Sequence, residues 1–432
     1  MKICVIGLGY VGLTLAITLA DCGIIVYGVD SKKETISSLK NGKSTISEKS
    51  VDLLLQKHLD TNLHVSENIP DIDFNAYMIC VGTPLNSTNL PILDHIISAS
   101  EETGKRLKKG QIVILRSTIP VGTTRKIIIP ILEKKSNLKS GVDFDVIFAP
   151  ERTAEGVALL ELKTNPQIIG SLTHEGIEKA TQIFKLMTQT IIPVSSIETA
   201  EMMKLIDNTY RDVRFAYANE IAIICEILKL DAKECIEKAN FQYPRNNIPM
   251  PSPGVGGPCL SKDPYILAHV ANQYGYNPEV ISHSRWVNEY IPSFLAKKIV
   301  RKIETMNKKE NLKIFIIGFA FKGNPETGDI RNSPTLILVE EMKKHFTNIV
   351  GYDPVVFASD IENIGIKVTT VQEGFKDADC VIIMNNHKSY QSLNVKELLR
   401  SSSKPCVFVD CWSMFRDIIK EYNVIYTGVG ID

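Results

Sequence analysis

The chain opens with KICVIGLGYVGLTLAITLADCGIIVYGVD, residues 2–30. Residues 2–6 are a short apolar run, which is typical of a buried parallel strand. A glycine-rich turn at 7–12 follows, and residues 11–22 are predicted as a helix closed by Gly23. Residues 24–29 are predicted as a second strand that ends at Asp30. This order of strand, turn, helix and strand indicates a right-handed βαβ unit in a parallel sheet.

The turn carries the pattern GxGxxG, made by Gly7-Leu8-Gly9-Tyr10-Val11-Gly12. Its glycines permit the tight turn, the close approach of a pyrophosphate and the packing of helix on strand. The amides at the N-terminus of the helix can then donate to the phosphates. Asp30 follows roughly 20 residues later, where an acid accepts hydrogen bonds from ribose hydroxyls and repels a 2′-phosphate. The pattern predicts NAD rather than NADP; a glycine-rich turn without a ligand is the alternative.

Polar residues follow three further predicted strands, at 76–81, 111–115 and 145–148. Thr83 follows the first, Thr118 the second, and Glu151 with Arg152 the third. Ligands bind at such positions in open α/β sheets, beyond the carboxyl ends of the strands. Thr118 and Glu151 are therefore candidates for contacting substrate or ordering a water. The alternatives are a helix cap for Thr118 and a surface acid for Glu151.

Residues 198–230 have a helical pattern, with an apolar stripe at Met202, Leu205, Ile206 and Tyr210. Lys204 and Asn208 are four residues apart, so both lie on one face of this helix. The lysine can stabilise an oxyanion, and the asparagine can bond a hydroxyl or a water. A solvated lysine and a surface asparagine are the alternative for an isolated pair of this kind.

Residues 247–264 are rich in proline and glycine and are predicted as a loop. The loop contains Gly256-Gly257-Pro258-Cys259, followed by Lys262 and Asp263. Glycines let a ligand approach the backbone closely, and a nearby cation favours the nucleophilic thiolate. Cys259 is therefore a candidate nucleophile, although a buried cysteine in an irregular loop is the alternative. Residues 265–305 are predicted to be helical.

A polar stretch at 306–311 is a candidate domain boundary, and the strand pattern of the N-terminal region then returns. Strands are predicted at 312–317, 349–352, 380–384 and 406–409. The fold class is therefore α/β, with two Rossmann-like parallel-sheet domains joined by a central helical domain. Periodicity leaves open whether the second α/β domain holds a nucleotide or is a structural cap.

The 432 residues include 49 basic and 49 acidic side chains, so the formal net charge is +0. This balance argues against nucleic acid or an acidic membrane as the main partner. Nine scattered cysteines are typical of reduced thiols in a cytoplasmic protein. Eight histidines form no metal-binding pattern, so no metal is expected. The apolar stretch at 3–20 is interrupted by glycines and is better explained by the βαβ unit than by a targeting segment.

These motifs together resemble the UDP-glucose/GDP-mannose dehydrogenase family. The similarity spans the whole chain and includes further segments: Cys80-Val81-Gly82-Thr83-Pro84, Val121-Gly122-Thr123-Thr124, Asn219-Glu220, and Gly318-Phe319-Ala320-Phe321-Lys322 with Asp329, Arg331, Ser333 and Pro334. The resemblance implies an NAD-binding domain at 1–197, a central helical dimerisation domain at 198–310 and a nucleotide-sugar-binding domain at 311–432. It also implies a homodimer or a higher homo-oligomer.

The resemblance implies a four-electron oxidation of a sugar C6 alcohol to a carboxylate with two NAD. Cys259 is expected to capture the intermediate aldehyde as a thiohemiacetal, which is then oxidised to a thioester and hydrolysed. The product is expected to be a precursor for surface polysaccharide or glycan synthesis. For catalysis the resemblance implies oxyanion stabilisation by Lys204 and Asn208, proton transfer by Asp263, and positioning of water by Thr118 and Glu151. The residues implied to contact the cofactor are Gly7, Gly9, Tyr10, Val11, Gly12, Asp30, Thr83, Thr118 and Arg331. Those implied to contact the sugar nucleotide are Glu151, Arg152, Lys204, Asn208, Gly256, Phe321 and Lys322.

The substrate implied by the resemblance is a UDP-N-acetylhexosamine, with UDP-N-acetylmannosamine first. Tyr243-Pro244-Arg245-Asn246-Asn247 resembles the segment of such members in which the arginine reaches the sugar site of a neighbouring subunit. Pro258 and Ser261 stand where many UDP-glucose enzymes have serine and proline. UDP-glucose oxidation remains an alternative. A two-electron hydroxyacid dehydrogenase and a non-catalytic NAD-binding protein are the others.

Overall fold

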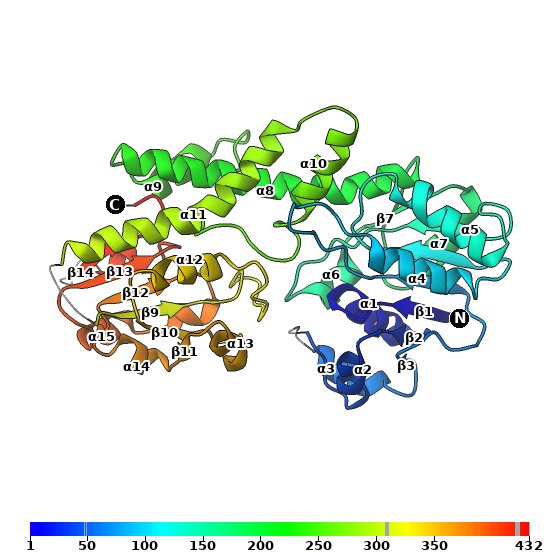
Figure 1. Ribbon diagram of the computed structural model, residues 1–432, viewed down its shortest axis with the longest axis horizontal. Coiled ribbons are helices and arrows are strands. Elements are labelled where there is room, and N and C mark those ends of the chain that lie inside the picture. Colours follow the sequence, from blue (N-terminus) through cyan, green and yellow to red (C-terminus); the bar gives the residue numbers. More distant parts are fainter. Residues whose placement is uncertain (47, 49, 307–310, 420–423, 432) are drawn as a thin grey trace. The chain divides into compact units, whose positions relative to one another are not determined.

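The computed structural model describes residues 1–46, 48, 50–306, 311–419 and 424–431, and its backbone is drawn in Figure 1. The chain divides into two compact units. Unit 1 contains Met1–Asp207 and Tyr265–Asn277, and unit 2 contains Asn208–Pro264 and Pro278–Asp432.

Unit 1 is built on a sheet that has eight strands within the described residues. They are β1 (Lys2–Ile6), β2 (Ile25–Val29), β3 (Leu63–Ser66), β4 (Ala76–Ile79), β5 (Ile112–Leu115), β6 (Asp145–Phe148), β7 (Gln167–Ser171) and β8 (Ile191–Pro193). Their order is β3-β2-β1-β4-β5-β6-β7-β8, and all neighbours are parallel except β6 and β7. The strand order reverses between β1 and β4, and in open α/β sheets ligands bind beyond the carboxyl ends of the strands at such a point.

Helices cover both faces of this sheet, because successive strand side chains alternate between two apolar cores. In β1, Ile3 and Val5 belong to one core, while Cys4 and Ile6 belong to the other. The first core is covered by α1 (Tyr10–Asp21), α2 (Lys33–Lys40), α3 (Val51–His58), α6 (Ala158–Thr164) and α7 (His174–Phe184). The second is covered by α4 (Asp94–Gly104), α5 (Ile129–Ser136) and the start of α8 (Ile197–Ile227), with the short π-helix η1 (Thr124–Ile128) leading into α5.

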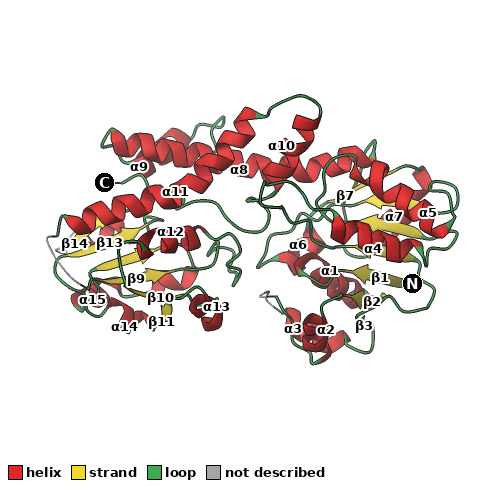
Figure 2. Cartoon of the chain, viewed as in Figure 1, coloured by secondary structure: helices red, strands yellow, loops and turns green. Residues whose placement is uncertain are grey.

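Unit 2 contains a parallel sheet that has six strands within the described residues. They are β9 (Lys313–Ile317), β10 (Asn348–Tyr352), β11 (Lys367–Val368), β12 (Cys380–Ile383), β13 (Cys406–Asp410) and β14 (Val424–Thr427), in the order β11-β10-β9-β12-β13-β14. Its helical segments are α11 (Glu279–Glu304), α12 (Pro334–Lys343), α13 (Ala358–Asn363), α14 (Val371–Phe375), η2 (Lys388–Ser392), α15 (Val395–Arg400) and α16 (Arg416–Ile419), shown in red in Figure 2.

Helix α9 (Ala232–Asn240) also belongs to unit 2, while α8 and α10 (Asp263–Gln273) each include residues of both units. The predicted helix at 265–305 is two helices, because Gly275 adopts a left-handed φ of 81° and Pro278 precedes α11. The first of them also begins two residues early, at Asp263.

The predicted fold class is confirmed, and each predicted strand coincides with an observed one to within two residues. Strands β3, β7, β8, β11 and β14 were not predicted. Strands β3, β8, β11 and β14 are short and partly exposed, so their apolar signal is weak. Strand β7 is buried, but only Ile168 and Ile169 of its residues are large and apolar. The candidate boundary at 306–311 lies largely outside the described residues, since 307–310 are among those not described. The three-domain division stays a prediction.

Candidate active site

The glycine-rich turn joins β1 to α1 at the point where the strand order reverses. Gly7 has a φ of 89°, which side chains rarely adopt. A Cβ at Gly12 would stand 1.7 Å from the carbonyl oxygen of Gly7, so no side chain fits there. Around Gly9 the described chain leaves open space, because apart from its own neighbours no heavy atom comes within 4 Å of where its Cβ would stand. The turn therefore packs against its own backbone at Gly12, whereas at Gly9 it is exposed to solvent.

Polar groups at the ends of the neighbouring strands suit a dinucleotide. Asp30 is half-buried after β2 and accepts the N–H of Leu8 at 2.8 Å and the N–H of Lys32 at 2.9 Å. Carboxylate oxygens have further lone pairs, so Asp30 can still accept from ribose hydroxyls. Thr83 follows β4, and its hydroxyl oxygen is buried without a hydrogen-bond partner in the part of the chain that the structure describes. An orphaned buried hydroxyl is costly unless a ligand satisfies it, so these residues fit the predicted cofactor.

Tyr10 makes a contact that sequence reasoning missed. Its hydroxyl bonds the carboxylate of Glu48 and accepts the N–H of Gly156 at 3.0 Å. Glu48 also accepts the N–H of Ala158 at 3.0 Å, at the start of α6. Burial, with the hydrogen bond to Glu48 second, holds the pKa of Tyr10 well above its usual range. Tyr10 thus ties the glycine-rich turn to the segment before α6, and its predicted cofactor contact stays a prediction.

Glu151 lies after β6 in a buried ion pair with Arg116, the residue after β5. Its other carboxylate oxygen accepts the N–H groups of Arg152 and Thr153, both at 2.7 Å. Burial raises the pKa of Glu151, but Arg116 and Lys204 outweigh it, so the net pKa is lowered. Glu151 is therefore an anion whose orientation is set by Arg116. The signal for Arg116 was present in the sequence as a charged residue that directly follows an all-apolar strand.

We expect Arg116→Met to cost about 3–5 kcal/mol of unfolding free energy at pH 7, because it leaves Glu151 buried without its cation. Because folding lowers the pKa of Glu151, the ion pair contributes fully to the free energy of unfolding at any pH above the pKa of Glu151 in the unfolded state. This contribution is lost as the pH falls through the pKa of Glu151 in the folded state. The difference from the parent protein should therefore shrink in acid. Denaturant unfolding from pH 7 downward measures both effects.

Arg125→Met is the matched control, because Arg125 forms a largely exposed pair with Glu198. We expect it to cost less than about 1 kcal/mol. Equal losses in the two variants would contradict the importance assigned to the buried pair.

Three other candidates lie in unit 1 with distinct surroundings. Arg152 donates to Asp207 and to the carbonyl oxygen of Pro166, both at 3.2 Å. Thr118 is half-buried just beyond β5. Lys204 is buried on α8 and lowers the pKa of Glu151. Unit 1 therefore brings Lys204 and Glu151 into electrostatic contact.

In unit 2 the cysteine loop runs directly into α10. The Cys259 carbonyl oxygen accepts the N–H of Lys262 at 3.0 Å and of Asp263 at 2.9 Å, which forms a tight turn after the thiol. The Asp263 carboxylate is fully buried and accepts from the Asn208 amide and, at 2.6 Å, from Lys262 Nζ. Arg211 donates to Asn208 Oδ1 at 2.6 Å. Cys259 itself is exposed and not in a disulfide. The structure thus brings Cys259, Asp263 and Asn208 together.

The two glycines of the loop are held against the segment after β9. A Cβ at Gly256 would stand 1.9 Å from the carbonyl oxygen of Asn332, and one at Gly257 would stand 2.6 Å from the ring of Phe321. The close contact is possible only because both residues lack a side chain. Phe321 therefore lies beside the cysteine loop, and its predicted contact with the nucleotide sugar stays a prediction.

The remaining candidates are held by neighbours in the same unit. The Lys322 ammonium lies 5.5 Å from the centroid of the Phe321 ring. Arg331 is exposed and bonds Asp329 through Nε at 2.8 Å. Arg245 is exposed, with its guanidinium 4.8 Å from the centroid of the Tyr243 ring. Their proposed contacts with cofactor or substrate remain predictions.

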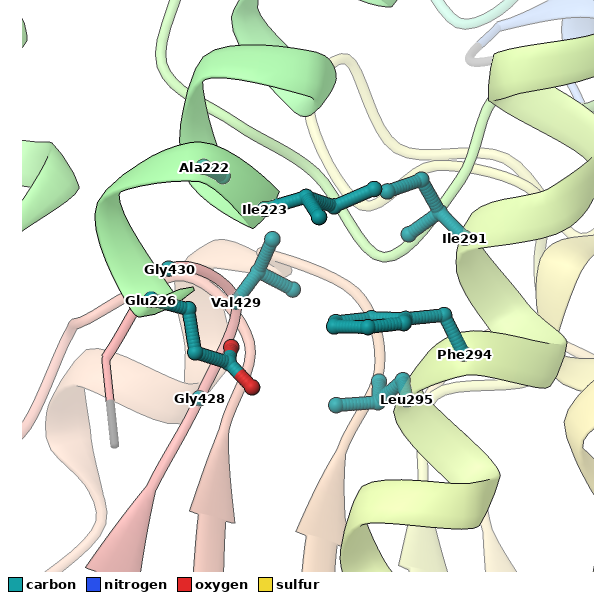
Figure 3. A pocket seen from close by; sticks show the side chains of 9 residues that line it. All are labelled: Ala222, Ile223, Glu226, Ile291, Phe294, Leu295, Gly428, Val429 and Gly430. Carbon is teal, nitrogen blue, oxygen red and sulfur yellow. The ribbon is translucent and has the colours of Figure 1, made fainter. Parts of the chain in front are cut away.

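A small cavity in unit 2 lies away from the cysteine loop, between α8, α11 and the residues after β14 (Figure 3). Its lining is apolar apart from Glu226, whose carboxylate points toward the cavity in Figure 3 and accepts from Lys298 at 2.7 Å. The volume of about 10 Å³ has room for roughly one water molecule. This cavity therefore cannot hold a nucleotide sugar.

Sequence models of three domains of one family match the chain in order. They are the NAD-binding domain of the UDP-glucose/GDP-mannose dehydrogenase family over residues 1–188, its central domain over 198–290 and its UDP-binding domain over 315–417. The chain therefore belongs to the UDP-glucose/GDP-mannose dehydrogenase family, and it is an NAD-dependent nucleotide-sugar dehydrogenase. The open question about the second α/β domain is thereby answered in favour of the nucleotide-binding alternative.

Relatives match over the full length. A UDP-N-acetyl-D-mannosamine dehydrogenase from Pyrococcus horikoshii is 35% identical over 100% of this chain and 99% of its own length. A solved UDP-D-ManNAc dehydrogenase from Pyrococcus horikoshii has a TM-score of 0.89 at 34% identity, covering 100% of this chain and 99% of its own. The UDP-N-acetyl-mannosamine dehydrogenase Cap5O from Staphylococcus aureus has a TM-score of 0.84 at 31% identity, covering 100% and 98%.

The described residues contain neither a candidate membrane-spanning helix nor a candidate metal site. None of the helices there combines the length and the apolar character needed to cross a membrane. Nor do three or more His, Cys, Asp or Glu side chains gather there in a way that could hold a metal ion.

Proposed function

We propose that this protein oxidises the C6 hydroxyl of a UDP-N-acetylhexosamine, UDP-N-acetylmannosamine in particular, to the uronic acid. The similarity to UDP-N-acetyl-D-mannosamine dehydrogenases over the whole chain is the observation that carries the substrate assignment. The Tyr243-Pro244-Arg245 segment supports it, because Arg245 is exposed and can reach a neighbouring subunit. The uronic acid would serve as a precursor for surface polysaccharide or glycan synthesis.

The chemistry requires a thiol because an aldehyde must be held between two oxidations. NAD supplies a hydride acceptor for each oxidation. Cys259 Sγ adds to the aldehyde carbon, and its proton passes to the carbonyl oxygen. The resulting thiohemiacetal carbon then loses a hydride and its hydroxyl group loses a proton, which gives a thioester. Water breaks the C–S bond, releasing the carboxylate and restoring the thiol. One alcohol, two NAD⁺ and one water give one carboxylate, two NADH and three protons.

The other candidate residues have separate tasks in this scheme. Asp263 moves protons to and from the reacting oxygens, and its position is set by Asn208 and Lys262. Lys204 and Asn208 stabilise the developing oxyanions. Glu151 orders the hydrolytic water together with Thr118, and it suits that task because it is ionised and fixed by Arg116.

A screen of NADH production over UDP-ManNAc, UDP-GlcNAc, UDP-GalNAc, UDP-Glc and GDP-Man tests the substrate. We expect the highest kcat/KM with UDP-ManNAc and two NADH for each sugar oxidised. A preference of more than about 10-fold is reasonable, since losing one well-made polar contact costs about 1.4 kcal/mol or more.

Each outcome of this screen separates the alternatives. A preference for UDP-Glc would make the protein a UDP-glucose dehydrogenase. One NADH per substrate, on a hydroxyacid rather than a nucleotide sugar, would indicate a two-electron enzyme. Tight NAD binding without hydride transfer to any of the five sugars would indicate a non-catalytic NAD-binding protein.

We also propose that the chain forms a homodimer through α8. Ile206, Tyr210, Tyr217 and Ile224 are 47%, 60%, 51% and 44% exposed, and their spacing places them on one face of this helix. Part of the apolar stripe predicted from the sequence therefore faces outward instead of into the core. An exposed apolar helix face of this length favours association with another copy.

Replacing Ile224 with Asp should weaken this association, because it places a charge in the apolar contact. We expect the Kd for dimerisation to rise at least about 30-fold, or roughly 2 kcal/mol. Sedimentation across a concentration series measures it. Lys238→Glu on the exposed side of α9 is the control and should leave the equilibrium unchanged; an unaltered dimer of the Ile224→Asp protein would refute the α8 interface.

A cytoplasmic location is part of the same proposal. All nine cysteines lie within the described residues, and none forms a disulfide. Cysteines outside disulfides in this number are typical of a reducing compartment. Extraction without reducing agent, followed by thiol counting, should find the nine cysteines reduced.

A further inference from the structure

Arg285 on α11 donates hydrogen bonds to the backbone of the cysteine loop on both sides of the segment 256–259. Its side chain is 1% exposed. Nη2 donates to the carbonyl oxygen of Val255 at 2.7 Å, and Nη1 donates to that of Leu260 at 2.9 Å. These two carbonyl groups enclose the segment 256–259, so one rigid guanidinium spans the base of the loop that carries Cys259.

The charge of Arg285 is balanced within the same unit. Nη1 also contacts Asp212 Oδ1 on α8 at 2.7 Å, and Nε lies 3.3 Å from Glu289 Oε1. Asn288 donates to Asp212 Oδ1 and to the Asp212 carbonyl oxygen, both at 2.9 Å. The guanidinium is therefore locked between α8, α11 and the loop, and a buried pair with this many hydrogen bonds holds one orientation.

The opposite side of the loop is held by the segment after β9. Asn332 Nδ2 donates to Ser261 Oγ at 2.8 Å, and Ser261 Oγ donates to the carbonyl oxygen of Gly257 at 2.6 Å. The backbone of the loop is thereby constrained on both sides. Arg285 donates to a backbone carbonyl group on each side of the segment 256–259, so its removal frees the base of the loop.

We propose that Arg285 is a positioning residue that holds the Cys259 loop where its thiol can capture the aldehyde. This inference rests on the proposed role of Cys259 as the nucleophile. The first oxidation needs no thiol, whereas the second one does. Loss of the Arg285 contacts should therefore impair the second oxidation selectively, and the aldehyde should escape before it is captured.

The test compares Arg285→Lys and Arg285→Met with Arg301→Met, an exposed arginine on the same helix. Lysine keeps the charge beside Asp212, but one ammonium cannot span both carbonyl groups. With UDP-ManNAc, or the best sugar of the screen, we expect kcat for acid formation to fall about 10- to 100-fold in both Arg285 variants. KM for sugar and NAD should stay within about twofold.

Two further measurements distinguish a positioning role of Arg285 from a general loss of folded structure. NADH formed per sugar consumed should fall from two toward one, with the missing product trapped as the aldehyde hydrazone. Alkylation of Cys259 by iodoacetamide, followed by mass spectrometry without any substrate, should accelerate severalfold as the loop loosens. Arg301→Met should match the parent protein in every measurement.

Other outcomes overturn the inference. Two NADH per sugar at the parent rate in a folded Arg285→Lys protein would show that the contacts are not needed. Failure of both Arg285 variants to fold would also overturn it, because Arg285 would then serve the fold. Cys259→Ser is measured in parallel: if that variant makes acid at the parent rate, the proposed function fails, whereas an inactive Cys259→Ser beside a fully active Arg285→Met refutes only the positioning role.

Discussion

A Cys259→Ser protein will fold and bind NAD but will make uronic acid about 10³-fold more slowly than the parent protein, or slower still. The expected loss is large because removing the nucleophile of a covalent mechanism removes the path itself. Serine is close to cysteine in size, and Cys259 is exposed, so the substitution should barely change stability. The first oxidation should survive in part, since the scheme assigns it no thiol.

Quenched assays that separate acid, aldehyde and unreacted sugar measure this effect. Cys235→Ser is the matched control, because Cys235 is also exposed and lies on α9. We expect the control to keep the parent rate. Acid formation within tenfold of the parent rate by Cys259→Ser would contradict covalent catalysis at this residue.

Gly12→Ala should abolish detectable NAD binding, whereas Gly9→Ala should weaken it while leaving the fold intact. At Gly12 a Cβ would stand 1.7 Å from the Gly7 carbonyl oxygen, so the turn must move. We expect a stability loss of about 1–3 kcal/mol from this overpacking. The NAD Kd should rise by more than about 100-fold, roughly 2.8 kcal/mol.

The Gly9→Ala variant separates a loss of NAD affinity from a loss of stability. The φ of Gly9, −70°, suits alanine, and the described chain leaves open space where the Cβ would stand. Any loss of NAD affinity in Gly9→Ala must therefore come from the methyl group meeting the cofactor. Calorimetric NAD titration with thermal unfolding checks both variants. Parent-like NAD affinity in Gly12→Ala would refute the assignment of the turn.

Sequence patterns identified the glycine-rich turn, Asp30 and the cysteine loop because each is local. Strand, turn and helix lie within 30 residues at the N-terminus, so their spacing alone predicts a βαβ unit. Asp263 and Cys259 are likewise close in the chain, so the hydrogen bond from the Asp263 N–H to the Cys259 carbonyl oxygen is a local contact within one turn.

The buried charge pairs were not predictable in the same way. Arg116 and Glu151 are 35 residues apart, and Arg285 and Asp212 are 73 residues apart. No sequence spacing says which of many arginines meets which carboxylate, since only the packing of separate elements brings them together. The break between α10 and α11 was missed for a local reason, because Gly275 and Pro278 lie in an otherwise helical pattern.

The amino-acid sequence by itself thus determined the α/β fold, the turn for NAD, the candidate thiol and the family resemblance. These depend on periodicity and on motifs in which the interacting residues are neighbours in the chain. Only the tertiary structure decided how the Cys259 loop is held. Arg285 bonds two of its carbonyl groups from another helix, and Asn332 and Phe321 meet its glycines from a third segment. Such contacts arise when distant segments fold together in one core, where a buried charge must find its partner or be neutralised.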